Sequence, residues 1–196
     1  MEQAKARALL GLDDSASLEE VTDALDQAVF KVRDHFLRNA VVPRLAESKV
    51  EKCVQLSDAA QSLGVSSLGH PTSMPSMENL GTDLESLVVS HTENLRRCRG
   101  AMATTLDPDS IAQLGHLMSN IQLEYIHSFL QLTASMDIAT WPQAVPARQE
   151  ADWMGLLAAV RAAKGRPGAD VLFQEMVSKE RARMSAMVSS SQPTPR

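Results

Sequence analysis

The histidines and carboxylates in the middle of the chain are the side chains whose spacing could support chemistry. Glu124 and His127 form a Glu-x-x-His pair on one helical face, which is the spacing used by carboxylate-bridged di-iron bundles. Such a site needs a second motif of this kind and two further glutamates, and the sequence offers one motif only. His116 follows the small residue Gly115 and could be presented for phosphotransfer, but no lysine or glycine pattern follows it to position a phosphoryl group. We therefore expect neither a metal nor a phosphorylated histidine.

Signatures of other enzyme classes are also missing. The sequence has no Gly-x-Ser-x-Gly and no cysteine–histidine signature of a hydrolase. The turn at 165–168 lacks the lysine and the length of a phosphate-binding loop. The basic cluster at 96–99 points in three directions on a helix, which is typical of a solvated surface. We expect a protein that is not an enzyme, with no catalytic residues and no cofactor.

Composition and charge exclude further classes. The chain has 196 residues, of which 44% are hydrophobic, and 19 basic against 24 acidic residues give a net charge of −5. An acidic chain with only seven aromatic residues is a poor binder of nucleic acid, because it can neither neutralise phosphates nor stack bases. The most apolar stretch, 111–139, is interrupted by polar residues, which argues against a membrane span.

The start of the chain and its cysteines bear on the compartment. The segment 1–7 is polar and the apolar run after it is too short for a signal peptide. Cys53 and Cys98 lie far apart without metal-ligand spacing, so we interpret them as reduced, buried thiols. A disulfide is the alternative. These features together predict a cytoplasmic protein.

Helical periodicity dominates the first half of the chain, and no window alternates as a strand would. Ser17 and Glu20 form a capping box that opens a helix ending near Pro43. A further helix carries its apolar residues between 45 and 63 and stops at Gly64. The segment 64–81, rich in proline, glycine and serine, predicts a long connection that is either functional or mobile.

The second half begins with a second capping box, at Thr82 and Glu85. Asp107 and Pro108 then open a helix that could extend to about Met136. A linker is expected at 141–146, and a short amphipathic helix around 153–160. A turn at 165–168 and a final helix over 171–188 complete the pattern.

These elements predict an all-α fold, a mostly antiparallel helical bundle of four or five principal helices with a C-terminal helical hairpin. We expect the bundle over 1–139, with a flexible connection at 64–81, the hairpin over 140–188, and a disordered tail at 189–196. The segment 148–196 carries eight basic and five acidic residues. This basic hairpin either folds onto the acidic middle of the chain or presents a solvated face.

Residues 9–25 resemble the opening of a J-domain, in which a Leu-Gly-hydrophobic turn precedes a helix of the form Ala-x-x-x-Glu-(Ile/Val)-x-x-Ala. In this comparison the segment 52–63 stands in for that family's third helix. The family's His-Pro-Asp loop, which stimulates a chaperone ATPase, would fall near 33–35 and is absent. The resemblance covers about a quarter of the chain and implies a docking module without co-chaperone activity.

Two helical faces are candidates for contact with a partner. The helix after Pro108 is apolar around most of its circumference, so it is either central in the bundle or part of a subunit contact. On the helix after Ser17, a strip lies opposite the core stripe and consists of Phe30, Leu37 and Val41, flanked by Arg33. This strip either docks a partner or is buried under the C-terminal hairpin.

The leading hypothesis is a non-enzymatic adaptor, assembly factor or regulatory subunit that acts through protein–protein contacts. One alternative is a small-molecule sensor or carrier with an apolar pocket between helices. We expect its pocket to be lined by His91, Met102, Met118 and Tyr125, although His91 in an apolar stripe is also typical of a hydrogen-bonded core histidine. The third possibility is self-assembly as a homo-oligomer.

Overall fold

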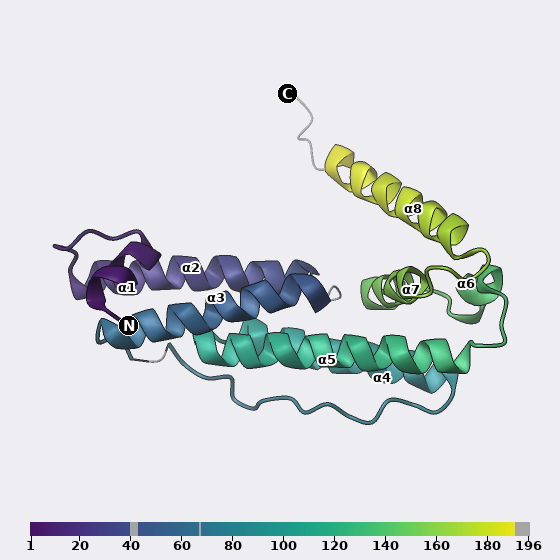
Figure 1. The fold of residues 1–196 in the computed structure, drawn as a ribbon, viewed down its shortest axis with the longest axis horizontal. Coiled ribbons are helices and arrows are strands. Elements are labelled where there is room, and N and C mark those ends of the chain that lie inside the picture. Colours follow the sequence, from purple (N-terminus) through teal and green to yellow (C-terminus); the bar gives the residue numbers. More distant parts are fainter. Residues whose placement is uncertain (40–42, 67, 191–196) are drawn as a thin grey trace.

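The chain is helical throughout the residues that the computed structural model describes, which are 1–39, 43–66 and 68–190. Four long helices lie side by side along the longest dimension of the molecule (Figure 1). They are α2 (Leu18–Asn39), α3 (Pro43–Ser62), α4 (Leu84–Ala103) and α5 (Pro108–Leu132). Around them lie α1 (Gln3–Leu10), the 3-10 helix η1 (Ile138–Thr140), α6 (Trp141–Ala144), α7 (Glu150–Ala162) and α8 (Ala169–Ser190). The predicted all-α class is confirmed.

The helices begin where side chains can accept the free backbone N–H groups of a first turn. Ser17 and Glu20 form the predicted capping box, because the Glu20 carboxylate accepts from the Ser17 N–H at 2.8 Å and the Ser17 hydroxyl accepts from the Glu20 N–H at 3.3 Å. Asp107 caps α5 as predicted. α4 begins one residue later than the sequence indicated: its cap is Asp83, whose carboxylate accepts from the Ser86 N–H, and not Thr82.

The connection between α3 and α4 is long because it crosses the whole bundle. Figure 1 shows it running from one end of the molecule to the other, so that α4 follows the same direction as α3. The Gly69 carbonyl in this connection accepts from the Thr105 hydroxyl at 2.6 Å, and the His70 ring lies 3.0 Å from the Ser110 hydroxyl. A parallel crossing of this kind accounts for the length of 64–81.

The sequence analysis did not predict three short helical segments, α1, η1 and α6. α1 precedes the capping box at Ser17, and its Ala6 is fully buried. The predicted linker at 141–146 instead contains α6, because the Trp141 indole is buried and packs edge-on against Phe129, with 4.9 Å between ring centroids. The predicted tail at 189–196 begins within α8, and residues 191–196 lie outside the described residues.

α5 contributes to both hydrophobic clusters of the core. Its first half, including Leu114 and Met118, packs with α2, α3 and α4. Its second half, with Tyr125 and Phe129, packs with α6, α7 and the start of α8. The wide apolar face that suggested a central helix or a subunit contact is therefore covered largely by the protein's own helices, although Leu123 remains 53% exposed.

A glycine of α5 leaves room for a buried aromatic ring of α2. A Cβ atom added at Gly115 would lie 2.6 Å from Cζ of Phe36, whose ring is buried. Gly100, on the exposed side of α4, has nothing within 4 Å of such an atom. The two glycines form a matched pair in which the same substitution has opposite consequences.

We expect Gly115→Ala to lower the free energy of unfolding by about 1–2 kcal/mol, because the added methyl overpacks the contact with Phe36. Gly100→Ala should raise it by about 0.5–1 kcal/mol, because alanine favours the helix and meets no neighbour. Urea denaturation of both variants measures the two effects. A stabilising Gly115→Ala would contradict the packing of α2 on α5 described above.

Candidate functional site

The strip predicted on α2 is only partly present. Phe30 is 55% exposed, and the Arg33 guanidinium lies over its ring at 5.1 Å from the centroid. Arg33 also donates to the Thr105 carbonyl at 3.2 Å, which ties it to the α4–α5 turn. Leu37 is half-buried against the core, and Val41 lies outside the described residues. The C-terminal hairpin does not bury Phe30. Within the described part of the strip, Phe30 is therefore the apolar side chain that is accessible to a partner.

The four residues predicted to line a pocket lie in the close-packed interior. His91 and Tyr125 stack on each other, with ring centroids 4.0 Å apart, where α4, α5 and α7 meet. Met102 and Met118 are buried in the other cluster, with α2 and α3. None of the four lines either of the two hollows described below, so the predicted pocket stays a prediction.

His91 is a hydrogen-bonded core histidine, which is one of the two interpretations that the sequence allowed. Its Nε2 donates to the Gln122 side-chain oxygen at 3.0 Å. Burial lowers the pKa of His91 to about 4, although the Gln122 hydrogen bond and the charge of Asp152 favour protonation. The imidazole is therefore neutral at neutral pH.

α7 packs directly on this stacked pair through a glycine. A Cβ atom at Gly155 would lie 2.9 Å from Cε1 of His91 and 3.1 Å from Cε1 of Tyr125. Burial also raises the pKa of the Tyr125 hydroxyl. The backbone of α7 thus rests on two neutral aromatic rings, and this contact sets the position of the whole C-terminal hairpin.

A cleft of about 550 Å³ lies between α4 and the segment that leads into α7. Apolar side chains of Leu84, Val88 and Val145 line one part of it. The polar part contains Asp152, which is 7% exposed and accepts from the Thr92 hydroxyl and from the Gln149 N–H. The Asp152 carboxylate is engaged in capping α7, which accounts for its burial at this position.

A second hollow, of about 380 Å³, lies on the other side of the start of α7, between α7 and α8. Arg148 and Gln149 line both hollows. The second hollow also contains charged side chains of α8 and the Trp153 indole, and its further lining residues include Glu150, Lys179, Glu180 and Arg183.

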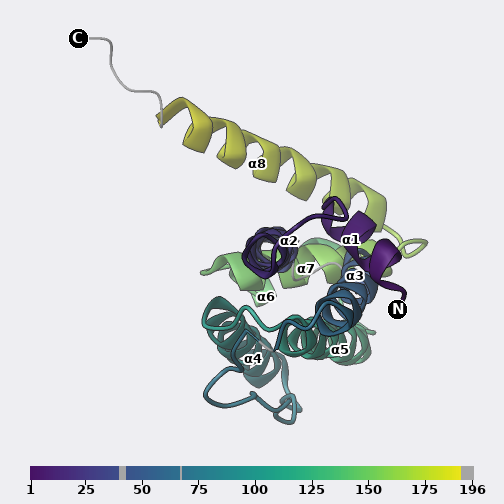
Figure 2. The same cartoon turned by 90° about the vertical axis from the view of Figure 1, so that its left-hand side faces the viewer.

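α8 is the element that leaves the body of the protein. Figures 1 and 2 show it rising away from the other helices toward its C-terminal end. The first half packs against α7 and η1, and Leu172 and Met176 are buried there. Every residue from 181 to 187 is exposed. We refer to residues 179–190 as the α8 overhang.

The apolar face of α8 continues into the overhang. The side of α8 that faces the body contains Leu172, Phe173 and Met176. The same spacing recurs eleven residues later, at Arg183, Met184 and Met187. Eleven residues are about three helical turns, so both sets lie on one face of α8. Met184 is 58% exposed and Met187 57%. The sequence predicted this helix but not the overhang. The apolar stripe is continuous along α8, so the sequence does not indicate at which residue the contact with the body ends.

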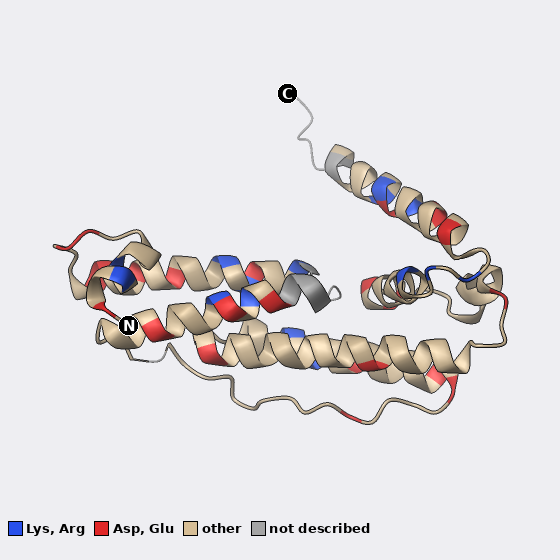
Figure 3. Ribbon diagram, in the orientation of Figure 1, with Lys and Arg blue, Asp and Glu red and all other residues tan. Residues whose placement is uncertain are grey.

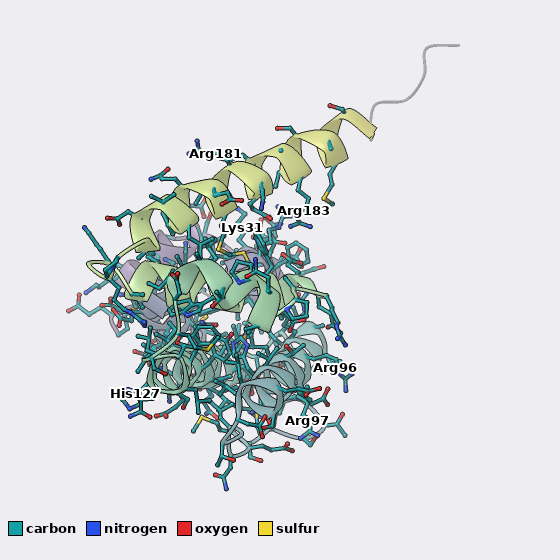
Figure 4. All side chains as sticks on the ribbon, turned by 90° about the vertical axis from the view of Figure 1, so that its right-hand side faces the viewer. Lys31, Arg96, Arg97, His127, Arg181 and Arg183 are labelled. Atoms are coloured by element: carbon teal, nitrogen blue, oxygen red, sulfur yellow. The ribbon has the colours of Figure 1, made fainter. Side chains whose placement is uncertain are left out.

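The other candidate side chains do not form a site. Glu124 and His127 are exposed on α5, and Figure 4 shows His127 on the outer side of the body. Over 1–39, 43–66 and 68–190, no three histidine, cysteine or acidic side chains gather as metal ligands. Cys53 and Cys98 are free, as predicted, and burial raises the pKa of their thiols to about 12 and 11.

The described part of the chain contains no helix that combines the length and the apolar character needed to cross a membrane. The segment 33–35, where the J-domain comparison placed a loop, lies inside α2. No protein-family model, curated protein or solved structure matches the chain.

His91 makes stability depend on pH in a defined direction. The unfolded chain takes up a proton on His91 near pH 6.5, whereas the folded protein does so only near pH 4. As the pH falls through this window, the free energy of unfolding should therefore fall by up to about 3 kcal/mol. His91→Leu should abolish this part of the pH dependence, as measured by urea denaturation at pH 7 and pH 4.5.

His116→Leu is the control for this experiment, because the His116 side chain is exposed to water in the folded protein. It should keep the pH dependence of the unsubstituted protein. If His91→Leu also keeps it in full, His91 is protonated in the folded state and the stacked, neutral arrangement with Tyr125 is wrong.

Proposed function

We propose that this protein is a non-enzymatic adaptor, assembly factor or regulatory subunit that binds another protein through the α8 overhang. The observation that carries the proposal is the exposure of Met184 on the helical face that the body buries three turns earlier. Burial of apolar surface is the dominant favourable contribution to most protein–protein association. An exposed continuation of a core-facing stripe is therefore a natural surface for a partner.

The regular helical form of α8 also supports this function. Its second half continues a regular helix whose first half is anchored, so a partner would meet a preformed surface and would not pay for ordering it. Phe30 on α2 offers a second, separate apolar side chain with a cation over its ring. The protein would contribute geometry and contact area, as expected of an adaptor.

The cleft between α4 and α7 gives weaker support to the alternative of a small-molecule carrier. Its volume would suit a small ligand. However, its buried carboxylate, Asp152, is already occupied in capping α7, and the four residues predicted to bind a ligand lie elsewhere. The adaptor remains the function that we propose.

Site-specific photo-cross-linking tests the proposal. A photoreactive residue at position 184 should form a cross-link to another protein in the cells that make this chain, and excess unlabelled protein should compete with it. The same residue at position 185 is the matched control, because Ser185 is also exposed but points to a different side of α8. We expect little or no cross-linking from position 185.

Two results would contradict the proposal. Equal cross-linking from both positions would indicate random collisions. A cross-link to a second copy of the chain alone would favour self-assembly over the adaptor.

A further inference from the structure

The α8 overhang is basic although the protein as a whole is acidic. It carries three cations, Lys179, Arg181 and Arg183, against one anion, Glu180, in a chain of net charge −5. Figure 3 shows these charges on α8, and Figure 4 places Arg183 on the side of α8 that faces the body and Arg181 on the outer side. The overhang therefore combines positive charge with the exposed side chain of Met184.

The hollow between α7 and α8 continues this basic, partly apolar surface beneath the overhang. Three cations, Arg148, Lys179 and Arg183, line it together with Trp153 and two anions, Glu150 and Glu180, so its lining carries a net positive charge. The Trp153 indole N–H is buried and has no acceptor in the described part of the structure. The volume of the hollow, about 380 Å³, falls within the range of about 300–1,000 Å³ that is common for binding pockets.

The cations of this surface can be recruited by a ligand at little cost. Lys179 pairs with Glu175 at 2.7 Å and Arg183 with Glu180 at 2.6 Å, both within α8 and both in contact with solvent. Ion pairs that solvent can reach contribute little to stability. Arg148 and Arg181 form no ion pair with any residue that the structure describes.

We propose that the overhang and the α7–α8 hollow together bind an acidic amphipathic segment of the partner protein. This inference rests on the proposed function and names the chemistry of the partner. The apolar side of the segment packs on Met184 and reaches toward Trp153. Its carboxylates pair with Arg148 and Arg183 at the hollow and with Arg181 on the outer side of α8.

Charge argues against a symmetric dimer in which two overhangs pair with each other. Two overhangs brought together would each carry an excess of two positive charges, and like charges at close range repel. The apolar component argues against a nucleic acid, because Met184 would find no partner on a phosphate backbone, and an excess of two cations forms few phosphate contacts. An acidic amphipathic segment satisfies both components of the surface.

A pair of synthetic peptides of about 16 residues provides the probe. Both carry leucine on one helical face, and their polar positions are glutamate in one peptide and lysine in the other. Fluorescence anisotropy with the full-length protein should show at least 10-fold tighter binding of the glutamate peptide. Its affinity should fall several-fold between low and high salt, because the charge contacts are exposed.

Substitutions assign the binding to this surface. Arg148→Glu combined with Arg183→Glu should weaken binding of the glutamate peptide at least 10-fold, and Met184→Ser should weaken it several-fold. Arg161→Glu, which reverses an exposed charge elsewhere on α7, is the matched control and should leave the affinity unchanged. Thermal unfolding verifies that each variant is folded.

Equal binding of the two peptides, or an unchanged affinity of the Arg148→Glu/Arg183→Glu protein, would overturn the inference. Tighter binding of phosphatidylglycerol vesicles or polyuridine RNA than of the glutamate peptide would overturn it too. If position 184 cross-links to a partner while the glutamate peptide fails to bind, the adaptor function stands and the acidic chemistry of the partner is wrong. If both fail, both proposals are wrong.

Discussion

The contact of α7 with the stacked rings of His91 and Tyr125 is the interaction on which the C-terminal part of the structure depends. Gly155 lets the α7 backbone approach His91 and Tyr125 closely, because a side chain at that position would collide with both rings. The first turn of α7 and the segment that leads into it line both the cleft beside α4 and the α7–α8 hollow. A change in this contact would move both hollows and the helix that follows them.

The turn between α7 and α8 fixes the direction in which α8 leaves α7. Gly165 and Gly168 adopt positive φ angles of 96° and 82°, a conformation that residues with a side chain rarely take. Arg166 between them donates to the carbonyls of Thr133 and Met136 beyond the end of α5 and lies over the Trp141 ring. The overhang therefore leaves the body from an anchored turn, which makes its exposed face a defined surface and not a loose tail.

Local signals in the sequence predicted much of this structure, and long-range arrangement explains what they missed. Caps at Ser17 and Asp107 depend on neighbouring residues, and His91 could be assigned from its place in an apolar stripe. The segment 141–146 was predicted as a linker but contains a helix, whose Trp141 indole is buried against Phe129. The spacing of residues in the sequence does not reveal this contact. The overhang was missed for a similar reason: Met184 follows the same stripe as Phe173, and only the folded body shows that Phe173 packs against the core whereas Met184 is 58% exposed.

Hydrogen exchange of the isolated protein, followed by mass spectrometry, tests the central claim that α8 is docked by its first half alone. We expect slow exchange for amides around Leu172 and Met176, comparable to α7, because local opening there must break packing with the body. Amides from 181 to 187 should exchange faster, because every side chain in this part of α8 is exposed to solvent. Equal protection along the whole of α8 would contradict the account, since it would mean that the overhang is already covered in the isolated protein.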